Sequence, residues 1–153
     1  MAGCRITGDM VPLRFAVATH ILLLLAGAPE RPGEGTEPAT SFWLAARVHT
    51  NPVVVRRISG QLARAGLLRV RRGAGGAALA RPADAITLED VWLAVSGHAA
   101  RPLLALPSPA GDGQDGARAL AVLAGAFGEA EAAFRGGLRG ITLRRLAEQM
   151  AAG

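Results

Sequence analysis

The 153-residue sequence contains one cysteine, no tyrosine and no lysine, and aromatic residues make up only 4% of it. Because Cys4 is the only thiol, a metal site built from several local thiolates is excluded. The three histidines, His20, His49 and His98, have no ligand spacing, and no paired carboxylates or Ser/His/Asp set support catalysis. We therefore predict no catalytic residues, no metal site and no enzyme activity.

Acidic side chains are missing from one long stretch. Between Ser41 and Pro82 the chain has eight arginines and no Asp or Glu, although the whole chain has 17 basic and 12 acidic residues. The stretch thus carries eight positive charges, whereas the remaining nine arginines and 12 acids leave a formal charge of −3. A solvated surface normally mixes both signs, so this composition favours a polyanionic partner.

Within this stretch, residues 52–65 are predicted to form an amphipathic helix. Asn51 is a favourable N-cap, Pro52 suits the first helical position, and Gly66 ends the helix. One face is apolar and bears Val55, Ile58, Leu62 and Ala65. The opposite face bears Val53, Arg56, Arg57, Gly60 and Arg64. Such a helix alone is more often an ordinary solvated one, but the missing acids and the following hairpin favour a recognition helix.

A glycine-rich hairpin is expected directly after this helix. Residues 67–70 and 77–80 pair as strands, and the glycines between them permit positive φ and close backbone approach. The tip comprises Arg71, Arg72, Gly73, Ala74, Gly75 and Gly76. A nucleotide-phosphate loop is the alternative, but it would open a helix, and Arg81 and Pro82 follow here instead. We interpret residues 69–81 as a wing that lies along phosphate or enters a minor groove.

These motifs together resemble a known family. NPVVVRRI, QLARAGLL, RRGAGGAAL and ARPADAITLEDVW follow one another in the order seen in the winged-helix regulator family of IscR, NsrR and CymR, the Rrf2 family. The resemblance runs from about residue 14 to residue 95 and, more loosely, to the C-terminus. It implies a bacterial, cytoplasmic, homodimeric transcription factor that binds a palindromic operator in double-stranded DNA, commonly represses, and has no membrane partner.

The segment 97–116 departs from the family pattern. In metal-bearing members it carries three cysteines that ligate an iron–sulfur cluster, but here it has none. No iron–sulfur cluster and no other cofactor are therefore expected. A small-molecule effector in a pocket between the winged domain and the long helix stays open, although no residue identifies one. Cys4 is either a thiol switch or, more simply, an unremarkable thiol.

The N-terminal part divides into an arm of residues 1–13 and a helix of residues 14–26 that is apolar nearly all round. A secretory signal is the alternative reading of this apolar run, against which stand Asp9 ahead of it and His20 within it. The run is also too short to span a bilayer comfortably. We expect the helix to be retained and His20 to lie within the helix packing.

Two further helices complete the predicted winged domain. Thr40 or Ser41 caps the first helix of a helix-turn-helix, which ends at Val48 and crosses the phosphate backbone. Phe42 and Trp43 on that helix are expected in core or rim packing. After the wing, Thr87 and Asp90 form a variant capping box. The helix that they begin carries an apolar stripe, expected under the wing, of Leu88, Val91, Trp92 and Val95.

The C-terminal part is predicted to be helical. Residues 117–138 form a long Ala-rich helix, and its apolar stripe consists of Leu120, Leu123, Ala124, Phe127, Ala130 and Phe134. Sequence alone leaves dimerisation and intramolecular packing equally open, and the family resemblance favours dimerisation. Thr142 caps a last helix. The predicted division is therefore an arm (1–13), a winged helix-turn-helix domain (14–96), an irregular linker (97–116) and a dimerisation region (117–153).

The predicted fold is mainly α with a small β-wing, a winged helix-turn-helix followed by a long C-terminal dimerisation helix. The recognition helix enters the major groove, and the wing holds phosphate or minor groove. The predicted DNA-binding residues are Ser41, Thr50, Asn51, Val53, Arg56, Arg57, Gly60, Arg64, Arg71, Arg72, Gly73, Gly75 and Gly76. The remaining alternatives are a winged-helix protein-interaction or ligand-sensor module without DNA binding, and a secreted protein.

Overall fold

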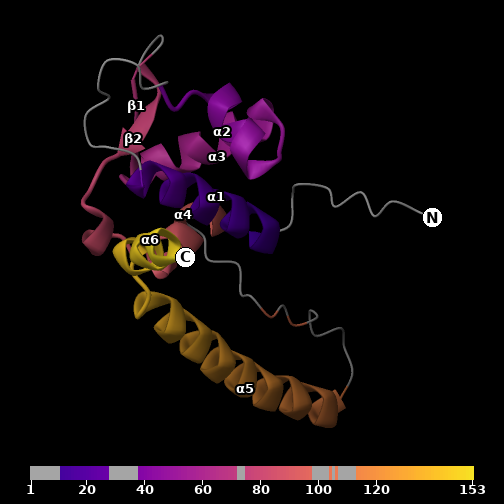
Figure 1. Ribbon diagram of the computed structural model, residues 1–153. Coiled ribbons are helices and arrows are strands. Elements are labelled where there is room, and N and C mark those ends of the chain that lie inside the picture. Colours follow the sequence, from indigo (N-terminus) through magenta and orange to yellow (C-terminus); the bar gives the residue numbers. More distant parts are fainter. Residues whose placement is uncertain (1–10, 28–37, 72–74, 98–103, 105, 107–112) are drawn as a thin grey trace, which may run out of the picture.

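A computed structural model describes residues 11–27, 38–71, 75–97, 104, 106 and 113–153 of the chain. Its elements are α1 (Val11–Ala26), α2 (Ser41–Val48), α3 (Pro52–Arg64), β1 (Leu68–Val70), β2 (Ala77–Leu79), η2 (Ala83–Ala85), α4 (Leu88–Ser96), α5 (Gly113–Arg139) and α6 (Leu143–Ala152). Helices α1 to α4, the hairpin and α6 form one body, from which α5 extends (Figure 1). The predicted winged-helix fold is confirmed.

Helix α1 lies at the centre of the hydrophobic core. It contacts α2, α3, α4, α6 and β2, which is why its sequence is apolar on almost every side. Ile21 and Leu22 are fully buried, together with Leu44 of α2 and Ile58 of α3. The expectation for His20 was wrong, because its side chain lies on the exposed strip of this helix.

Side-chain caps define where the helices of the winged domain begin. The Thr40 hydroxyl accepts a hydrogen bond from the backbone N–H of Trp43 at 3.2 Å, so Thr40 and not Ser41 is the cap of α2. Thr87 and Asp90 form the predicted reciprocal capping box at α4. Thr142 caps α6 in the same way as Thr40 caps α2. These caps could be predicted from the sequence because each depends on residues no more than three positions apart.

The hairpin is a two-stranded antiparallel sheet whose register pairs Arg69 with Ala78. Gly66 ends α3 with a φ of 70°, which leaves room for the chain to turn directly into β1. At the start of β2, the backbone N–H of Ala77 donates to the Ala39 carbonyl at 3.0 Å. The segment before α2 therefore anchors the wing at the end of the sheet next to its tip.

Several boundaries differ from the prediction. Helix α1 begins at Val11 and not at Arg14, because Pro12 is well tolerated in a first helical turn. Helix α5 runs over Gly113–Arg139, so four residues assigned to the linker are helical. Asp115 lies in that added first turn, where a negative charge is favoured by the helix dipole.

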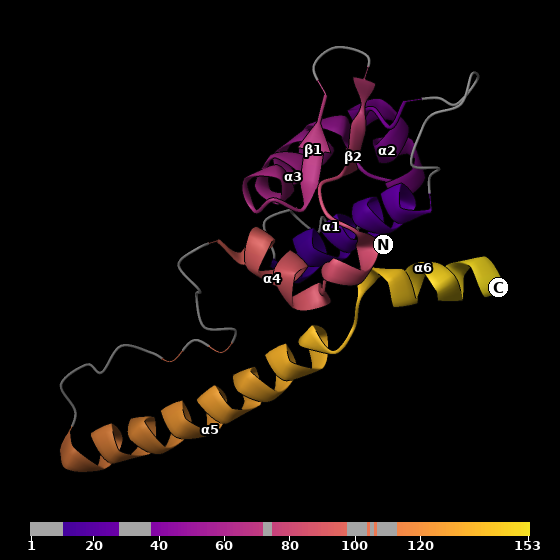
Figure 2. The same ribbon diagram turned by 90° about the vertical axis from the view of Figure 1, so that its left-hand side faces the viewer.

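Helix α4 links the winged domain to the C-terminal helices. It packs on α1, α3 and α5, and the expectation that its apolar stripe lies under the wing was wrong. Figure 2 shows α4 between α1 and α5. Trp92 is buried as predicted, and its ring makes edge-to-face contacts with Phe15 at 5.4 Å and Phe134 at 5.1 Å between centroids. Three aromatic rings thus connect α1, α4 and α5.

Helix α6 returns to the winged domain. It packs on α1 and η2, and the backbone N–H of Leu143 donates to the Ile86 carbonyl at 2.9 Å. The Leu88 N–H donates to the Ile141 carbonyl at the same distance. Leu143 is fully buried as a result. In the described ranges, no helix is long and apolar enough to cross a membrane.

Candidate nucleic-acid interface

Helix α3 presents its basic face to solvent because its apolar face is fully used by the core. Val55, Ile58 and Leu62 are buried with at most 1% of their surface exposed. The exposed side chains on the opposite side are those of Asn51, Val53, Arg56, Arg57 and Arg64. The structure therefore brings these five predicted residues together along one helix and its cap.

The turn between α2 and α3 fixes where α3 begins. His49 adopts a left-handed conformation with φ of 55°, and the Thr50 N–H donates to the Ala45 carbonyl at 3.0 Å. The Asn51 side-chain oxygen accepts a hydrogen bond from the Val53 N–H at 2.8 Å. The cap predicted from sequence is therefore formed, and it holds Thr50 half-buried beside the exposed Asn51.

Three further predicted DNA-binding residues, Ser41, Gly60 and Arg64, differ in their exposure to solvent. Ser41 occupies the first position of α2 and is half-buried. Gly60 is also half-buried, and a Cβ atom at this position would approach only the Arg64 Nη1 atom, at 3.9 Å. The glycine at this site is therefore not required by packing. Arg64 extends the basic face to the C-terminal end of α3.

The wing contains two glycines with different structural roles, while Arg72 and Gly73 lie outside the described residues. Arg71 is exposed, and its N–H donates to the Gly76 carbonyl at 2.9 Å. Gly75 is exposed, and a Cβ atom there would lie 2.5 Å from the Cβ atom of Arg71. Gly76 is buried with φ of 66°, and a Cβ atom would lie 2.6 Å from the backbone nitrogen of Ala39. The prediction that Gly76 binds DNA was therefore wrong. A buried glycine packed against Ala39 supports the fold and is not available to DNA.

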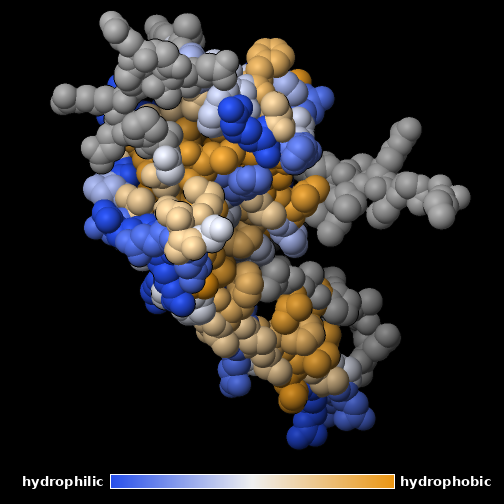
Figure 3. All heavy atoms as spheres, in the orientation of Figure 1, coloured by the Kyte–Doolittle hydropathy of each residue, from blue (hydrophilic) through white to orange (hydrophobic). Residues whose placement is uncertain are grey.

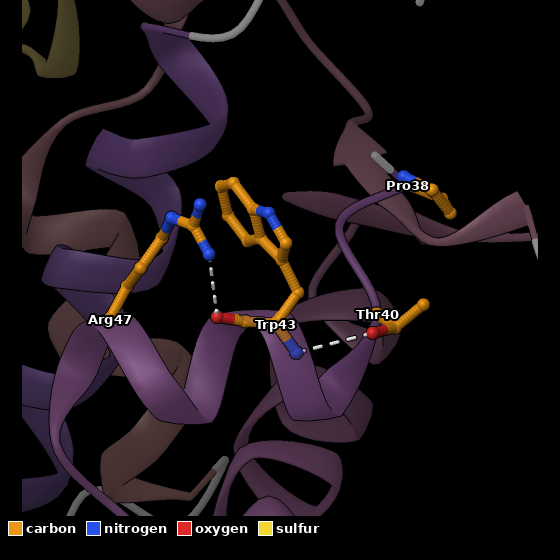
Figure 4. A pocket seen from close by; sticks show the side chains of 4 residues that line it. All are labelled: Pro38, Thr40, Trp43 and Arg47. Atoms are coloured by element: carbon orange, nitrogen blue, oxygen red, sulfur yellow. Dashed lines mark hydrogen bonds between the residues drawn. The ribbon is translucent and has the colours of Figure 1, made fainter. Parts of the chain in front are cut away.

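A guanidinium–indole stack on α2 was not predicted. The Arg47 guanidinium lies 3.6 Å from the centroid of the Trp43 ring, and Arg47 Nη1 donates to the Trp43 carbonyl at 3.5 Å. Together with Pro38 and Thr40 these side chains line an open surface pocket of about 360 Å³ (Figure 4). The spacing of four residues on a helix was the signal that could have revealed the stack. Phe42, expected in core or rim packing, is exposed instead.

A second group of arginines lies at the junction of α4 and α5. The Glu89 side chain is 9% exposed, and its carboxylate accepts hydrogen bonds from Arg139 Nε at 2.6 Å, Arg139 Nη2 at 2.9 Å and Arg135 Nε at 3.1 Å. The hydrogen bond from Arg139 outweighs burial and lowers the pKa of Glu89 below its ordinary value of 4.5, while the pKa of Arg139 is raised. Sequence reasoning missed this cluster because its members are 46 and 50 positions apart.

The basic face of α3 has different surroundings. Among the described residues, no acidic side chain forms an ion pair with Arg56 or Arg64. Ion pairs occur instead at Glu89 and between Arg144 and Asp84, at 3.8 Å. Within the same described ranges, no group of three His, Cys, Asp or Glu residues is arranged to hold a metal ion. The chemistry that this surface offers is therefore that of guanidinium groups and exposed apolar side chains.

Helix α5 leaves most of its length uncovered. Leu123 and Phe134 of the predicted stripe are exposed, whereas Leu120 and Phe127 are half-buried. Apolar residues cover much of this helix in the view of Figure 3. Such a surface on a projecting helix is unfavourable in water unless another chain covers it.

The fold and the basic face of α3 define a winged-helix protein with an exposed, arginine-rich helix face. The family model described as "Rrf2: Iron-dependent Transcriptional regulator" matches residues 13–149. The chain belongs to this Rrf2 family, which confirms the resemblance seen in its motifs, and the family is one of transcriptional regulators and not an enzyme class. Residues 97–116 of this chain contain no cysteine.

Individual relatives support the same conclusion. YwnA of Bacillus subtilis (strain 168), named as an HTH-type transcriptional regulator, is 42% identical over 87 residues, which are 56% of this chain and 59% of YwnA. The match therefore spans less than two thirds of YwnA. A solved structure from Lactobacillus plantarum, described as a transcriptional regulator, has a TM-score of 0.70 at 25% identity and covers 93% of this chain and 91% of that one. IscR of T. potens shares the fold, with a TM-score of 0.63 at 20% identity over 90% and 85% of the two chains.

Proposed function

We propose that this protein is a cytoplasmic regulator that binds a palindromic operator in double-stranded DNA as a homodimer and represses transcription. The observation that carries the proposal is the exposed arginine face of α3 within a stretch of 42 residues, 41–82, that contains no acid. Guanidinium groups pair bidentately with guanine in the major groove and with phosphate along the backbone. Family membership gives this surface its natural partner, duplex DNA.

The proposed docking uses the two ends of the surface differently. Arg56 and Arg57 lie within the first two turns of α3, the part of a recognition helix that reaches base edges. Arg64 and the wing residue Arg71 lie farther out and suit phosphate or minor groove, which position a protein without reading its sequence. Selection of random duplexes by the purified protein tests this function. We expect enrichment of one motif with two inverted half-sites, and no enrichment would contradict sequence-specific binding.

The homodimer is proposed from the uncovered apolar stripe of α5. In solution the stripe of one protomer would pack on that of its partner, which would place two copies of α3 on one face of the duplex. Leu123→Glu puts a charge into the stripe and should convert the dimer to a monomer. Val122→Glu is the matched control, because Val122 lies on the opposite side of α5 with Arg118 and Glu129.

Light scattering coupled to size-exclusion chromatography gives the mass of each variant. The expected result is a dimer for the wild type and Val122→Glu, and a monomer for Leu123→Glu. A wild-type monomer, or a dimer of unchanged mass for Leu123→Glu, would contradict this use of α5. We also propose that the protein works without an iron–sulfur cluster, because its linker supplies no thiolate ligands.

A further inference from the structure

An apolar side chain occupies the centre of the basic face of α3. Val53 is 61% exposed, and at about 100° per residue it lies between Arg56 and Arg57 on the helix surface. It contributes nothing to the core that Val55 and Ile58 fill. Valine is also a weaker helix former than alanine, so neither packing nor helix propensity calls for it at this position.

The polar groups next to Val53 are largely occupied by the fold. The Asn51 side-chain oxygen already accepts the Val53 N–H at 2.8 Å, so one of its two lone pairs is used by the helix cap. Pro52 has no N–H to donate, and the N–H of Thr50 is bonded to the Ala45 carbonyl. The exposed apolar group at this end of the helix is therefore the pair of methyl groups of Val53.

The major groove contains one apolar base substituent, the C5-methyl group of thymine. We propose that Val53 contacts this methyl group and makes a thymine a required base of each half-site, beside the base that Arg56 reads. This inference rests on the proposed function, because it assigns one base preference to the same helix. It concerns specificity and not the overall affinity for DNA, which the arginines supply.

Deoxyuridine tests the contact directly, because it differs from thymidine only by the absence of the methyl group. The duplex enriched by selection is synthesised with each thymine of the half-site replaced in turn by deoxyuridine, in both half-sites together. Removing one buried methyl group should weaken wild-type binding about fourfold per half-site, and thus about fifteenfold for the dimer, at a single position. Fluorescence anisotropy at one salt concentration measures each affinity.

Two variants establish whether Val53 is the partner of that methyl group. Val53→Ala should reduce the deoxyuridine penalty at this position to less than about twofold, because most of the apolar surface opposite the methyl group is gone. Val122→Ala is the matched control, since it makes the same change at another exposed helical valine, outside the interface, and should retain the full penalty. Circular dichroism checks that both variants keep the wild-type helix content.

The outcomes separate this inference from the function on which it rests. A penalty confined to one thymine, erased by Val53→Ala and retained by Val122→Ala, supports the contact. Specific binding with no deoxyuridine penalty, or with one that Val53→Ala leaves unchanged, overturns the contact and leaves the proposed function standing. A motif without thymine that binds better when its cytosine carries a C5-methyl group overturns the assignment to thymine. Failure to enrich any motif overturns both.

Discussion

The outer face of α3 and the junction between α4 and α5 both depend on arginine, but they surround it differently. At the junction, Glu89 is buried and receives hydrogen bonds from Arg135 and Arg139, so both guanidinium groups are paired with an acid of the same chain. On α3, Arg56 and Arg64 are exposed, and no acid occurs within the stretch 41–82. Arginine side chains therefore hold α4 and α5 together at the junction, whereas those on α3 remain exposed to solvent.

The junction between α4 and α5 also determines how α5 is held relative to the winged domain that carries α3. The junction fixes the base of α5 to the winged domain through an ion pair and through the contact of Trp92 with Phe134. A dimer formed along α5 would then hold its two copies of α3 at a defined separation. We therefore propose that the arginines at the junction position α3 and that the arginines on α3 contact the DNA.

The largest predicted effect on DNA binding is that of Arg56→Ala. If Arg56 pairs bidentately with a guanine, its removal should cost about 1–3 kcal/mol per half-site and relax discrimination at that base pair. Arg145→Ala removes another exposed guanidinium, from α6, and should leave binding unchanged. Titration of both variants against the selected duplex and its single-base variants provides the comparison. Equal losses in the two variants would contradict a special role for the α3 face.

The second prediction tests whether Gly76 belongs to the fold. Gly66→Ala should cost about 1 kcal/mol of unfolding free energy, because its φ of 70° disfavours a side chain but nothing lies within 4 Å. Gly76→Ala should cost clearly more, because its Cβ atom would also lie 2.6 Å from the Ala39 nitrogen. Urea unfolding of the two variants measures the difference. Equal stability would mean that Ala39 does not confine the wing.

The third prediction concerns the ion pair at the junction. The pKa of Glu89 is lower in the folded chain than its ordinary value of 4.5, so its ionised form stabilises the fold above pH 4.5. This contribution is lost as the pH falls below 4.5 and through the lowered pKa. Glu89→Gln should therefore have a Tm several degrees below that of the wild type at neutral pH, and the difference should shrink in acid. Glu129→Gln, at an exposed position of α5, should show no difference at either pH.

The smallest predicted effect is that of Arg71→Ala in the wing. Loss of one phosphate contact should weaken binding to all duplexes alike and reduce the slope of log K against log salt by about 0.9 per protomer. Affinities for the selected and the scrambled duplex, measured over a salt series, separate this effect from that of Arg56→Ala. A loss of affinity for the selected duplex alone would mean that Arg71 contacts a base and does not only position the protein on phosphate.

The sequence predicted those parts of the fold that depend on neighbours in the chain. The cap at Asn51, the capping box of Thr87 and Asp90 and the stop at Gly66 are local, and each is formed as expected. The buried face of α3 followed from helical periodicity alone. The bounds and the two faces of the recognition helix could therefore be predicted from the residues of that one segment.

The errors lie where distant parts of the chain meet. Gly76 lies in a glycine-rich run typical of an exposed wing tip, so it was predicted to be exposed. In the structure, Ala39 in the segment before α2 covers it. His20 sits in an apolar run whose one exposed strip could not be located without the packing of α2, α4 and α6 around it. The partners of Glu89 come from a helix about 50 positions away, and no spacing rule connects them.

The most direct test of the central claim is a fluorescence-anisotropy titration of the purified protein against its own upstream intergenic DNA and a scrambled duplex across a salt series. We expect a preference of about 10³-fold or more for the native DNA, with an affinity that falls steeply as salt is raised. We also expect that Arg56→Ala loses most of this preference. Equally weak binding to both duplexes at low salt would contradict the claim that the arginine face of α3 recognises this DNA.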